Sequence, residues 1–306
     1  MAERPSTFDP VTLRLFVAVC EERNIARAAD REAIAASAVS KRIAAIEAEI
    51  GAPLLVRGRR GIEPTAAGQA LLRQAREVLG TMARMHAELS DFATGAQGSV
   101  RVLASPSVLA EHLAEDIGAF LKRHPLVRVS LDERVSQEVI KGVQEGAADL
   151  GVLWDRSDRG SLAGVPYRSD RLCLATPLGH PLARRKRVAF ADALPHVNVS
   201  AAPGGMMDRL LEREAARLGQ PLVKRIQVSS MDAAARIVAA GLGPAILPRE
   251  AVQDHAASQG LALVPLTDDW AQRQFVICLR ADGSASAATR LLVEALRAAA
   301  APERAR

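Results

Sequence analysis

Apolar residues recur at the helical period in the first part of the chain. Between positions 36 and 50 they form one narrow stripe, which consists of Val39, Ile43, Ile46 and Ile50. Spacings of i, i+4, i+7 and i+11 place these side chains on one face of a helix. The opposite face carries short, mostly polar side chains, namely Ser37, Ser40, Lys41, Ala44 and Ala48. The pattern predicts a helix with one face in a core and a second face able to approach a polar partner closely.

Local end signals divide this region into three short helices. Asp9-Pro10 predicts the start of the first, because an acidic N-cap precedes proline at the first helical position. Asn24 is the expected N-cap of the second. Gly51-Ala52-Pro53 predicts the end of the third, which begins near Ala36 or Ser37. Three helices of this length predict one compact unit.

The segment LLVRGRRGIEPT follows, with an apolar start and three arginines separated by glycines. It predicts a tight hairpin, or wing, whose tip carries Arg57, Arg59 and Arg60. Guanidinium groups at a hairpin tip suit phosphate contacts or the minor groove. The alternative is a basic turn that is merely solvated.

A long helix is predicted from Thr65 onward. Its apolar residues repeat every seven positions, at Leu71, Val78, Met85 and Phe92, with Ala75, Met82 and Leu89 at the other heptad position. A seam kept over about three heptads favours two chains side by side. The alternative is a helix packed on its own domain. Positions 95–98, Gly-Ala-Gln-Gly, predict a hinge or linker after it.

Beyond the linker the pattern changes to short β-rich runs alternating with helical stretches. The runs are VRVLAS, VRVSL, DLGVLW, RLCLAT, HVNVS, RIQVS, AIL and QFVICL, and the helical stretches are 107–123, 136–146, 205–218, 231–241 and 286–299. Such alternation predicts parallel βαβ units in an α/β domain, with room for two lobes that each have their own sheet. The expected domains are 1–64, 65–97 and 98–306.

Composition adds three constraints. The net charge of +5 and pI near 9.5 permit a nucleic-acid partner without demanding one. No apolar run is long enough to span a membrane, and MAERPSTFDP lacks the apolar core of a signal peptide, so we expect a cytoplasmic protein with no membrane partner. Cys20, Cys173 and Cys278 are isolated from one another and are expected to be buried thiols.

The first 93 residues share a set of motifs with a known family. The motifs are Leu13, Phe16, Ala28-Ala29, Ala38-Val39-Ser40, Ile46-Glu47, Gly51, Leu54-Leu55-Val56-Arg57 and Thr65-Ala66-Ala67-Gly68. In this order they resemble the winged helix-turn-helix of LysR-type transcriptional regulators. Segments 145–152 and 240–248, EGAADLGV and AGLGPAILP, resemble the ligand-binding half of the family. The resemblance implies an N-terminal winged helix-turn-helix, a long linker helix and a two-lobed α/β effector-binding domain resembling periplasmic binding proteins.

The DNA-reading helix departs from the family pattern. Glu32 stands where many members carry leucine, and Ala35-Ala36-Ser37 stands where they often show Ser-Gln-Pro, so the usual base-reading glutamine is absent. We therefore expect base readout to rest on Ser37, Ser40 and Lys41. Arg42 is expected at a phosphate, together with the wing arginines.

The family binds a small inducer between its two lobes, and serines mark the matching strand ends here. Ser105 and Ser107 follow the first strand of the α/β half, Ser136 precedes a helix and Ser200 ends a strand. Hydroxyls and N–H groups at helix starts suit a carboxylate or other anion, so an organic acid is a candidate effector. The alternative for each serine is simple N-capping. Trp154 is either a wall of this site or an ordinary core residue.

Patterns for other chemistries are weak. The six histidines show no metal-ligand spacing, and neither a Gly-x-Ser-x-Gly elbow nor a Walker loop occurs. We therefore expect no enzyme activity, metal or cofactor. The sequence predicts a transcriptional regulator acting on double-stranded DNA as a homodimer or homotetramer, with RNA polymerase a further candidate partner. The alternative is a small-molecule solute-binding module without DNA function.

Overall fold

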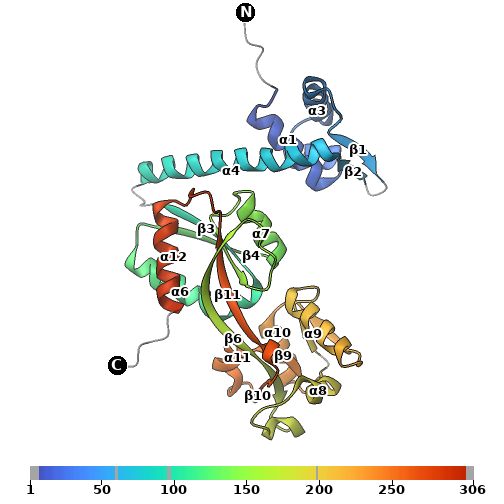
Figure 1. Cartoon of the computed structure of the whole chain (residues 1–306), viewed down its shortest axis with the longest axis vertical. Coiled ribbons are helices and arrows are strands. Elements are labelled where there is room, and N and C mark those ends of the chain that lie inside the picture. The colour runs from blue at the N-terminus through green and yellow to red at the C-terminus, as the bar shows by residue number, and fades with distance from the viewer. Residues whose placement is uncertain (1–6, 59–60, 95–97, 198, 301–306) are drawn as a thin grey trace, which may run out of the picture. The chain divides into compact units, whose positions relative to one another are not determined.

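The computed structural model describes residues 7–58, 61–94, 98–197 and 199–300, and only the backbone at positions 84, 87, 88 and 90–94. The chain divides into two compact units, residues 1–94 with 145–147, and the remainder. Figure 1 shows the elements of both units along the chain.

The first unit begins with three helices, as the sequence predicts. They are α1 (Pro10–Glu22), α2 (Ile25–Arg31) and α3 (Ala36–Ile50). Asp9 caps α1 by accepting from the N–H groups of Val11 and Thr12, and Asn24 caps α2 by accepting from the N–H of Arg27. Gly51 ends α3 at a φ of +73°, where a side chain would be strained. The predicted end signals are therefore confirmed.

The stripe on α3 packs into the core of this unit. Val39 and Ile46 are fully buried, and they lie in one cluster with Phe16, Ala28 and Ala29. Small residues on α2 allow the helices to approach closely. Each large side chain buried here stabilises the fold by about 1.5–3 kcal/mol.

A two-stranded hairpin follows the three helices. Strand β1 (Leu55–Gly58) pairs antiparallel with β2 (Gly61–Pro64). Gly61 has a φ of +109°, and a Cβ there would lie 2.5 Å from the carbonyl oxygen of Arg23. The next N–H, that of Ile62, donates to the same oxygen at 2.9 Å, so the wing is docked on the turn between α1 and α2. Arg59 and Arg60 lie outside the described residues.

Helix α4 (Ala66–Thr94) begins after Thr65, whose hydroxyl accepts from the N–H of Gly68. One side packs on α1, where Ala75 is buried against Leu13 and Val17. Part of the heptad seam therefore packs against its own unit. Its exposed apolar side chains are Val78, Met85 and Leu89. The side chain of Phe92 and the predicted hinge at 95–97 lie outside the described residues.

The second unit has two lobes. Lobe I has the strands β3 (Ser99–Ala104), β4 (Arg128–Glu133) and β5 (Leu150–Trp154), in which β3 pairs parallel with both others. Its helical segments are α5 (Pro106–Val108), the π-helical η1 (Leu109–Leu113), α6 (Ala114–Arg123), α7 (Ser136–Gln144) and α12 (Ala287–Ala300). The predicted helix 107–123 is therefore continuous but contains one π turn.

Lobe II contains the strands β7 (Val199–Ala201), β8 (Ile226–Val228), β9 (Ala245–Pro248) and β10 (Leu261–Pro265). Strand β7 pairs parallel with β8 and β9. Its helices are α8 (Phe190–Ala193), α9 (Met206–Arg217), α10 (Met231–Ala239) and α11 (Arg249–Ala256), with short 3-10 turns at η2 (Pro181–Arg184), η3 (Leu194–His196) and η4 (Asp269–Ala271). The sequence pattern did not predict β10, α8 or α11.

Two antiparallel strands join the lobes, and Figure 1 shows them running side by side from one lobe to the other. They are β6 (Ala163–Pro177) and β11 (Gln272–Leu279). The first half of β6 pairs with β11, and its second half pairs with β9 and β10. The sheets of the two lobes are therefore continuous through β6. The sequence left room for a separate sheet in each lobe and predicted a much shorter strand here.

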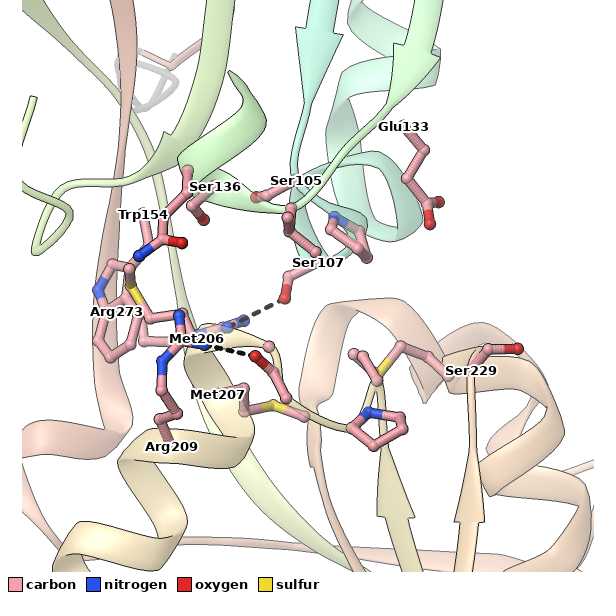
Figure 2. Close-up of a pocket in the computed structure, with 18 of the residues that line it drawn as sticks. Ser105, Ser107, Glu133, Ser136, Trp154, Met206, Met207, Arg209, Ser229 and Arg273 are labelled. Atoms are coloured by element: carbon pink, nitrogen blue, oxygen red, sulfur yellow. Dashed lines mark hydrogen bonds between the residues drawn. The ribbon is translucent and has the colours of Figure 1, made fainter. Parts of the chain in front are cut away.

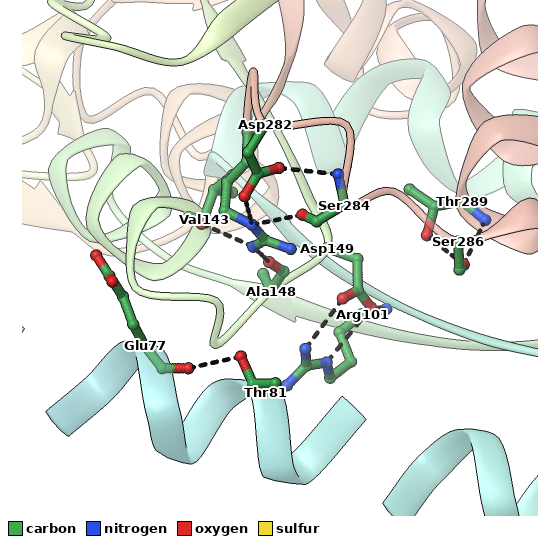
Figure 3. Close-up of polar contacts among 11 residues, drawn as sticks. Glu77, Thr81, Arg101, Val143, Ala148, Asp149, Asp282, Ser284, Ser286 and Thr289 are labelled. Atoms are coloured by element: carbon green, nitrogen blue, oxygen red, sulfur yellow. Dashed lines mark hydrogen bonds and ion pairs between the residues drawn. The ribbon is translucent and has the colours of Figure 1, made fainter. Parts of the chain in front are cut away.

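Polar contacts in lobe I surround the turn between α7 and β5 (Figure 3). Arg280, just after β11, donates to the carbonyl oxygens of Val143 and Ala148 at 3.0 and 3.1 Å. Arg101 on β3 pairs with Asp149 at 3.0 Å. These contacts hold the turn between α7 and β5 against two strands. Among the described residues, no helix is both long enough and apolar enough to cross a membrane.

Candidate functional site

The outer face of α3 presents the three side chains predicted to read bases. Ser37, Ser40 and Lys41 are all exposed, because the buried stripe of the same helix fixes its orientation. The Ser40 hydroxyl donates to the carbonyl oxygen of Ala36 at 3.1 Å, which leaves the oxygen lone pairs outward as acceptors. Two of these three side chains are short serines, which allow a partner to approach the helix closely.

Arg42 lies on the same helix but is engaged with α1. Its Nη1 donates to Asp9 at 2.8 Å and to the hydroxyl of Thr12 at 2.7 Å. A hydrogen bond from the Thr12 hydroxyl, helped by the nearby Arg42 charge, lowers the pKa of Asp9. The Arg42 side chain remains 42% exposed. It therefore ties α3 to the capped start of α1 and still reaches solvent.

A groove of about 210 Å³ separates α3 from the wing. Ser40 and Ala44 line one side, and Val56 and the exposed Arg57 line the other. Glu47 fixes the spacing, because its carboxylate accepts from the N–H groups of Leu54 and Leu55 at 2.7 and 3.2 Å. The structure thus brings the α3 face and Arg57 together, while Arg59 and Arg60 lie outside the described residues.

A cavity of about 360 Å³ opens between the two lobes. Figure 2 shows Ser105, Ser107 and Ser136 on the lobe I side, facing Met206, Met207 and Ser229 from lobe II. The other lining residues are Pro106, Glu133, Val135, Gln137, Trp154, Ala202, Pro203, Gly204, Gly205, Arg209, Met231, Arg273 and Phe275. The volume suits a small organic molecule, held by hydroxyls at one end and apolar side chains along its body.

Four of the five predicted effector contacts meet at this cavity. Ser105, Ser107, Ser136 and Trp154 all line it, and Trp154 is only 5% exposed. Ser200 is not among the lining residues, because its hydroxyl donates to the buried carboxylate of Asp208 at 2.9 Å. The sequence predicted that Ser200 ends a strand, whereas β7 continues to Ala201, and it could not show that Asp208 accepts a hydrogen bond from the Ser200 hydroxyl.

Asp208 organises the loop beside the cavity. Besides Ser200 it accepts from the N–H of Gly204 at 2.9 Å and pairs with Lys224 at 2.7 Å. Burial alone would raise the pKa of Asp208, but hydrogen bonds from Lys224, Gly204 and Ser200 outweigh burial and lower it. Since Gly204 lines the cavity, this network positions one of its walls.

Arg273 is the main cavity residue that the sequence did not reveal. It is 2% exposed, and its Nη1 donates to the Ser107 hydroxyl at 3.2 Å. Its Cζ lies 5.9 Å from the centre of the Trp154 ring and 5.2 Å from that of Phe275, within cation–π range. A signal was present, because Arg273 shares the strand face of Phe275 and Ile277 in an otherwise apolar alternation.

Comparisons with known proteins match both units. Residues 11–69 match the family of bacterial regulatory helix-turn-helix proteins of the LysR family, and residues 93–301 match the LysR substrate binding domain. The alternative of a solute-binding module would leave the first match unexplained.

Relatives and solved structures extend over most of the chain. An uncharacterized HTH-type transcriptional regulator of Mycobacterium tuberculosis is 31% identical over 82% of this chain and 84% of its own length. YnfL of Escherichia coli, another such regulator, is 30% identical over 77% of this chain and 80% of its own. The crystal structure of full-length CbnR with its target DNA has a TM-score of 0.65 at 24% identity, covering 96% of this chain and 100% of that one. These relatives are regulators and not enzymes, and this chain belongs to the LysR family of DNA-binding transcriptional regulators with an effector-binding domain.

Proposed function

We propose that this regulator reads double-stranded DNA through the exposed α3 face and the wing, as a homodimer or homotetramer, and responds to a small organic anion in the cavity between its lobes. The observation that carries the DNA part is the placement of Ser37, Ser40 and Lys41 opposite the buried stripe of α3 and beside the wing groove. An α-helix with short polar side chains fits the major groove.

Within this proposal the DNA contacts divide into two kinds. Ser37, Ser40 and Lys41 contact base edges, since hydroxyl and ammonium groups pair with their acceptors. Arg57, Arg59 and Arg60 contact phosphates or the minor groove and set affinity more than sequence choice. Arg42 chiefly holds α1 against α3, and its exposed part is available to a phosphate.

Homo-oligomerisation is supported by apolar surface on the first unit. A groove of about 540 Å³ is bordered mainly by apolar residues, including Phe8 just before α1, Leu13 on α1, Ile50 on α3 and Leu71 on α4. Val78 and Met85 leave nearly half of their surfaces exposed on α4. We propose that α4 of a second copy covers this groove, which would place two heads on two half-sites of one operator. A tetramer would pair two such dimers.

The effector part rests on the lining of the cavity. Ser105, Ser107 and Ser136 offer hydroxyls on one side, Trp154 gives an aromatic wall, and Met206 supplies an adaptable apolar surface. A small organic acid matches this set, with its carboxylate at the serines. The ligand would act by binding one arrangement of the lobes better than another. RNA polymerase is a further candidate partner of the DNA-bound regulator.

A gel shift with DNA from upstream of the protein's own gene tests the DNA part. We expect a specific, salt-sensitive shift that Ser40→Phe abolishes without changing the oligomeric state. Ser258→Phe is the control, because Ser258 is exposed in lobe II and lies outside the proposed DNA-binding residues. Unchanged operator affinity in Ser40→Phe would contradict the proposal, as would the absence of any salt-sensitive shift with the wild type.

A further inference from the structure

Three acidic side chains from three different elements meet around Arg273, and we name Glu111, Asp170 and Glu250 the hinge carboxyl cluster. One carboxyl oxygen of each lies within 4.8 Å of one from both others. Glu111 comes from the π-helical η1 of lobe I, Asp170 from the joining strand β6 and Glu250 from α11 of lobe II. Since η1 and α11 are in contact, the cluster spans both lobes and the strands between them. A π turn is a backbone irregularity that proteins often keep at functional positions.

Arg273 neutralises only part of this cluster. Its Nε donates to Asp170 at 2.8 Å, and its Nη2 donates to Glu111 at 3.0 Å and also to the second oxygen of Asp170. The side chains of Arg273, Glu111 and Asp170 are 2%, 1% and 0% exposed, so solvent does not screen them. With every carboxyl ionised, three negative charges would face one positive charge, and two of the three carboxyl side chains are buried. Such an excess is costly, and buried groups relieve it by taking up a proton or a cation.

Unsatisfied oxygens point to where the proton resides. Among the described residues, Oε2 of Glu111 and Oε2 of Glu250 are buried without any hydrogen-bond partner. Two ionised carboxylates offer only acceptors to each other, which is repulsive. One proton converts such a pair into donor and acceptor, because a protonated carboxyl gains an O–H group. Burial, reinforced by the neighbouring Asp170 charge, raises the pKa of Glu111 to about 10.

A proton fits the cluster better than a divalent cation does. Arg273 already donates to two of the three carboxyl groups, so a metal ion would lie beside a fixed positive charge. Magnesium and calcium also prefer six or more oxygen ligands, for which three carboxyl groups, two of them buried beside a guanidinium, are a poor match.

The other titratable groups near the cluster leave the proton on Glu111. Cys173 on β6 is buried, and burial together with the Glu250 charge raises the pKa of its thiol to about 12, so it stays neutral. The charge of Arg249, on the same helix as Glu250, opposes the rise in the pKa of Cys173. The charge of His112, the neighbour of Glu111 on η1, lowers the pKa of Asp116 on α6.

We propose that Glu111 holds a proton at neutral pH and that this proton removes repulsion within the hinge carboxyl cluster, whose members join lobe I to lobe II. Arg273 connects the cluster to the cavity, because it donates to Glu111 and Asp170 and also lines the cavity. An anion bound in the cavity competes with Glu111 and Asp170 for the same guanidinium, so its binding favours further protonation of the cluster. By reciprocity, lower pH strengthens binding of that anion. This last consequence alone rests on the proposed effector site.

The test uses the full chain without DNA or effector, so its result is independent of the proposed function. Wild type and Glu111→Gln are unfolded in urea between pH 5 and pH 8, followed by tryptophan fluorescence. Both tryptophans, Trp154 and Trp270, belong to the second unit and report on it alone. The amide keeps an acceptor for Arg273 and mimics a protonated carboxyl.

A carboxyl group that stays protonated only in the folded state has a higher pKa there than in the unfolded chain. Folding therefore becomes less favourable as pH rises above the pKa of the unfolded chain. We therefore expect the unfolding equilibrium constant of the wild type, relative to Glu111→Gln, to increase by about tenfold per pH unit in this range. Glu294→Gln, at an exposed position of α12, should show no such trend. A ratio independent of pH would overturn the proposal.

Two further measurements guard against a variant that fails to fold. Infrared spectra of the wild type at neutral pH should contain the C=O band of a buried protonated carboxyl, and its absence would overturn the proposal. Wild-type stability should also be the same with magnesium or manganese as with EDTA. Stabilisation by either metal that EDTA reverses and Glu111→Gln abolishes would assign the cluster to a cation instead.

Discussion

The α3 face and the cavity between the lobes hold their polar groups in opposite ways. Ser37, Ser40 and Lys41 stand in solvent on one helix whose buried stripe aims them. Ser105 and Arg273 are buried, at positions far apart in the chain, and Arg273 is fixed by a network of ion pairs. Charges at an exposed site are screened by salt, whereas removing one partner of a buried ion pair leaves an uncompensated charge and destabilises the domain.

The largest expected effect comes from removing the centre of the buried network. Arg273→Ala leaves Asp170 and Glu111 without their partner and should destabilise the second unit by about 3–5 kcal/mol. Urea unfolding followed by tryptophan fluorescence measures this change. Arg236→Ala is the matched control, because Arg236 pairs with Asp232 on the surface with both side chains more than half exposed. It should cost at most about 1 kcal/mol. An equal loss of unfolding free energy in the two variants would contradict the expected difference between buried and exposed ion pairs.

Ligand binding in the cavity should give the next largest effect. At about 100 times its dissociation constant, an organic acid that binds only the folded protein should stabilise it by about 2.7 kcal/mol. A calorimetric screen of mono- and dicarboxylic acids measures the shift. Ser229→Trp, at the exposed lobe II side of the cavity, should abolish it, while Ser258→Trp outside the lining should not. A shift that survives in Ser229→Trp would place the ligand elsewhere.

Asp208→Asn should have an intermediate effect on the loop beside the cavity. We expect it to destabilise the second unit by about 1–3 kcal/mol, because the buried hydrogen bonds from Ser200, Gly204 and Lys224 lose their charged acceptor. The pKa of Asp208 is lowered in the fold, so its contribution is present at neutral pH and is lost as pH falls through that lowered pKa. Thermal unfolding from neutral to acidic pH should show the difference between wild type and variant shrinking. Asp232→Asn, at an exposed carboxyl, should lack this trend.

Arg57→Ala should have the smallest effect and a different signature. Loss of one phosphate contact should weaken all DNA sequences alike and reduce the slope of log affinity against log salt by about 0.9. Fluorescence anisotropy at several salt concentrations measures this slope. Arg60→Ala should act in the same direction. Slopes identical to that of the wild type would show that the wing does not contact phosphate.

The same contrast explains what the sequence could predict. Asp9, Asn24 and Gly51 act within a few residues of themselves, so the helix ends of the first unit follow from local signals. The α3 face follows from periodicity alone. The two lobes follow from the alternation of strands and helices. The resemblance to the family then supplied the expected function, which the comparisons confirm.

The remaining features depend on contacts between distant positions. Strand β6 carries Arg168 and Asp170 in a stretch without regular alternation, so its first half could not be recognised. Arg273 meets Ser107 across 166 positions, and no local pattern joins them. Ser200 has a sequence context similar to that of Ser105 and Ser107, but in the fold its hydroxyl donates to Asp208 and does not line the cavity.

The coupling between the two regions is tested most directly by DNA affinity measured with and without a carboxylic acid that passes the calorimetric screen. In the wild type we expect the acid to change the affinity or the footprint on upstream DNA. In Ser229→Trp we expect unchanged DNA binding without acid and no response to acid. An equal response in both proteins would contradict the account, because the acid would then act without occupying the cavity.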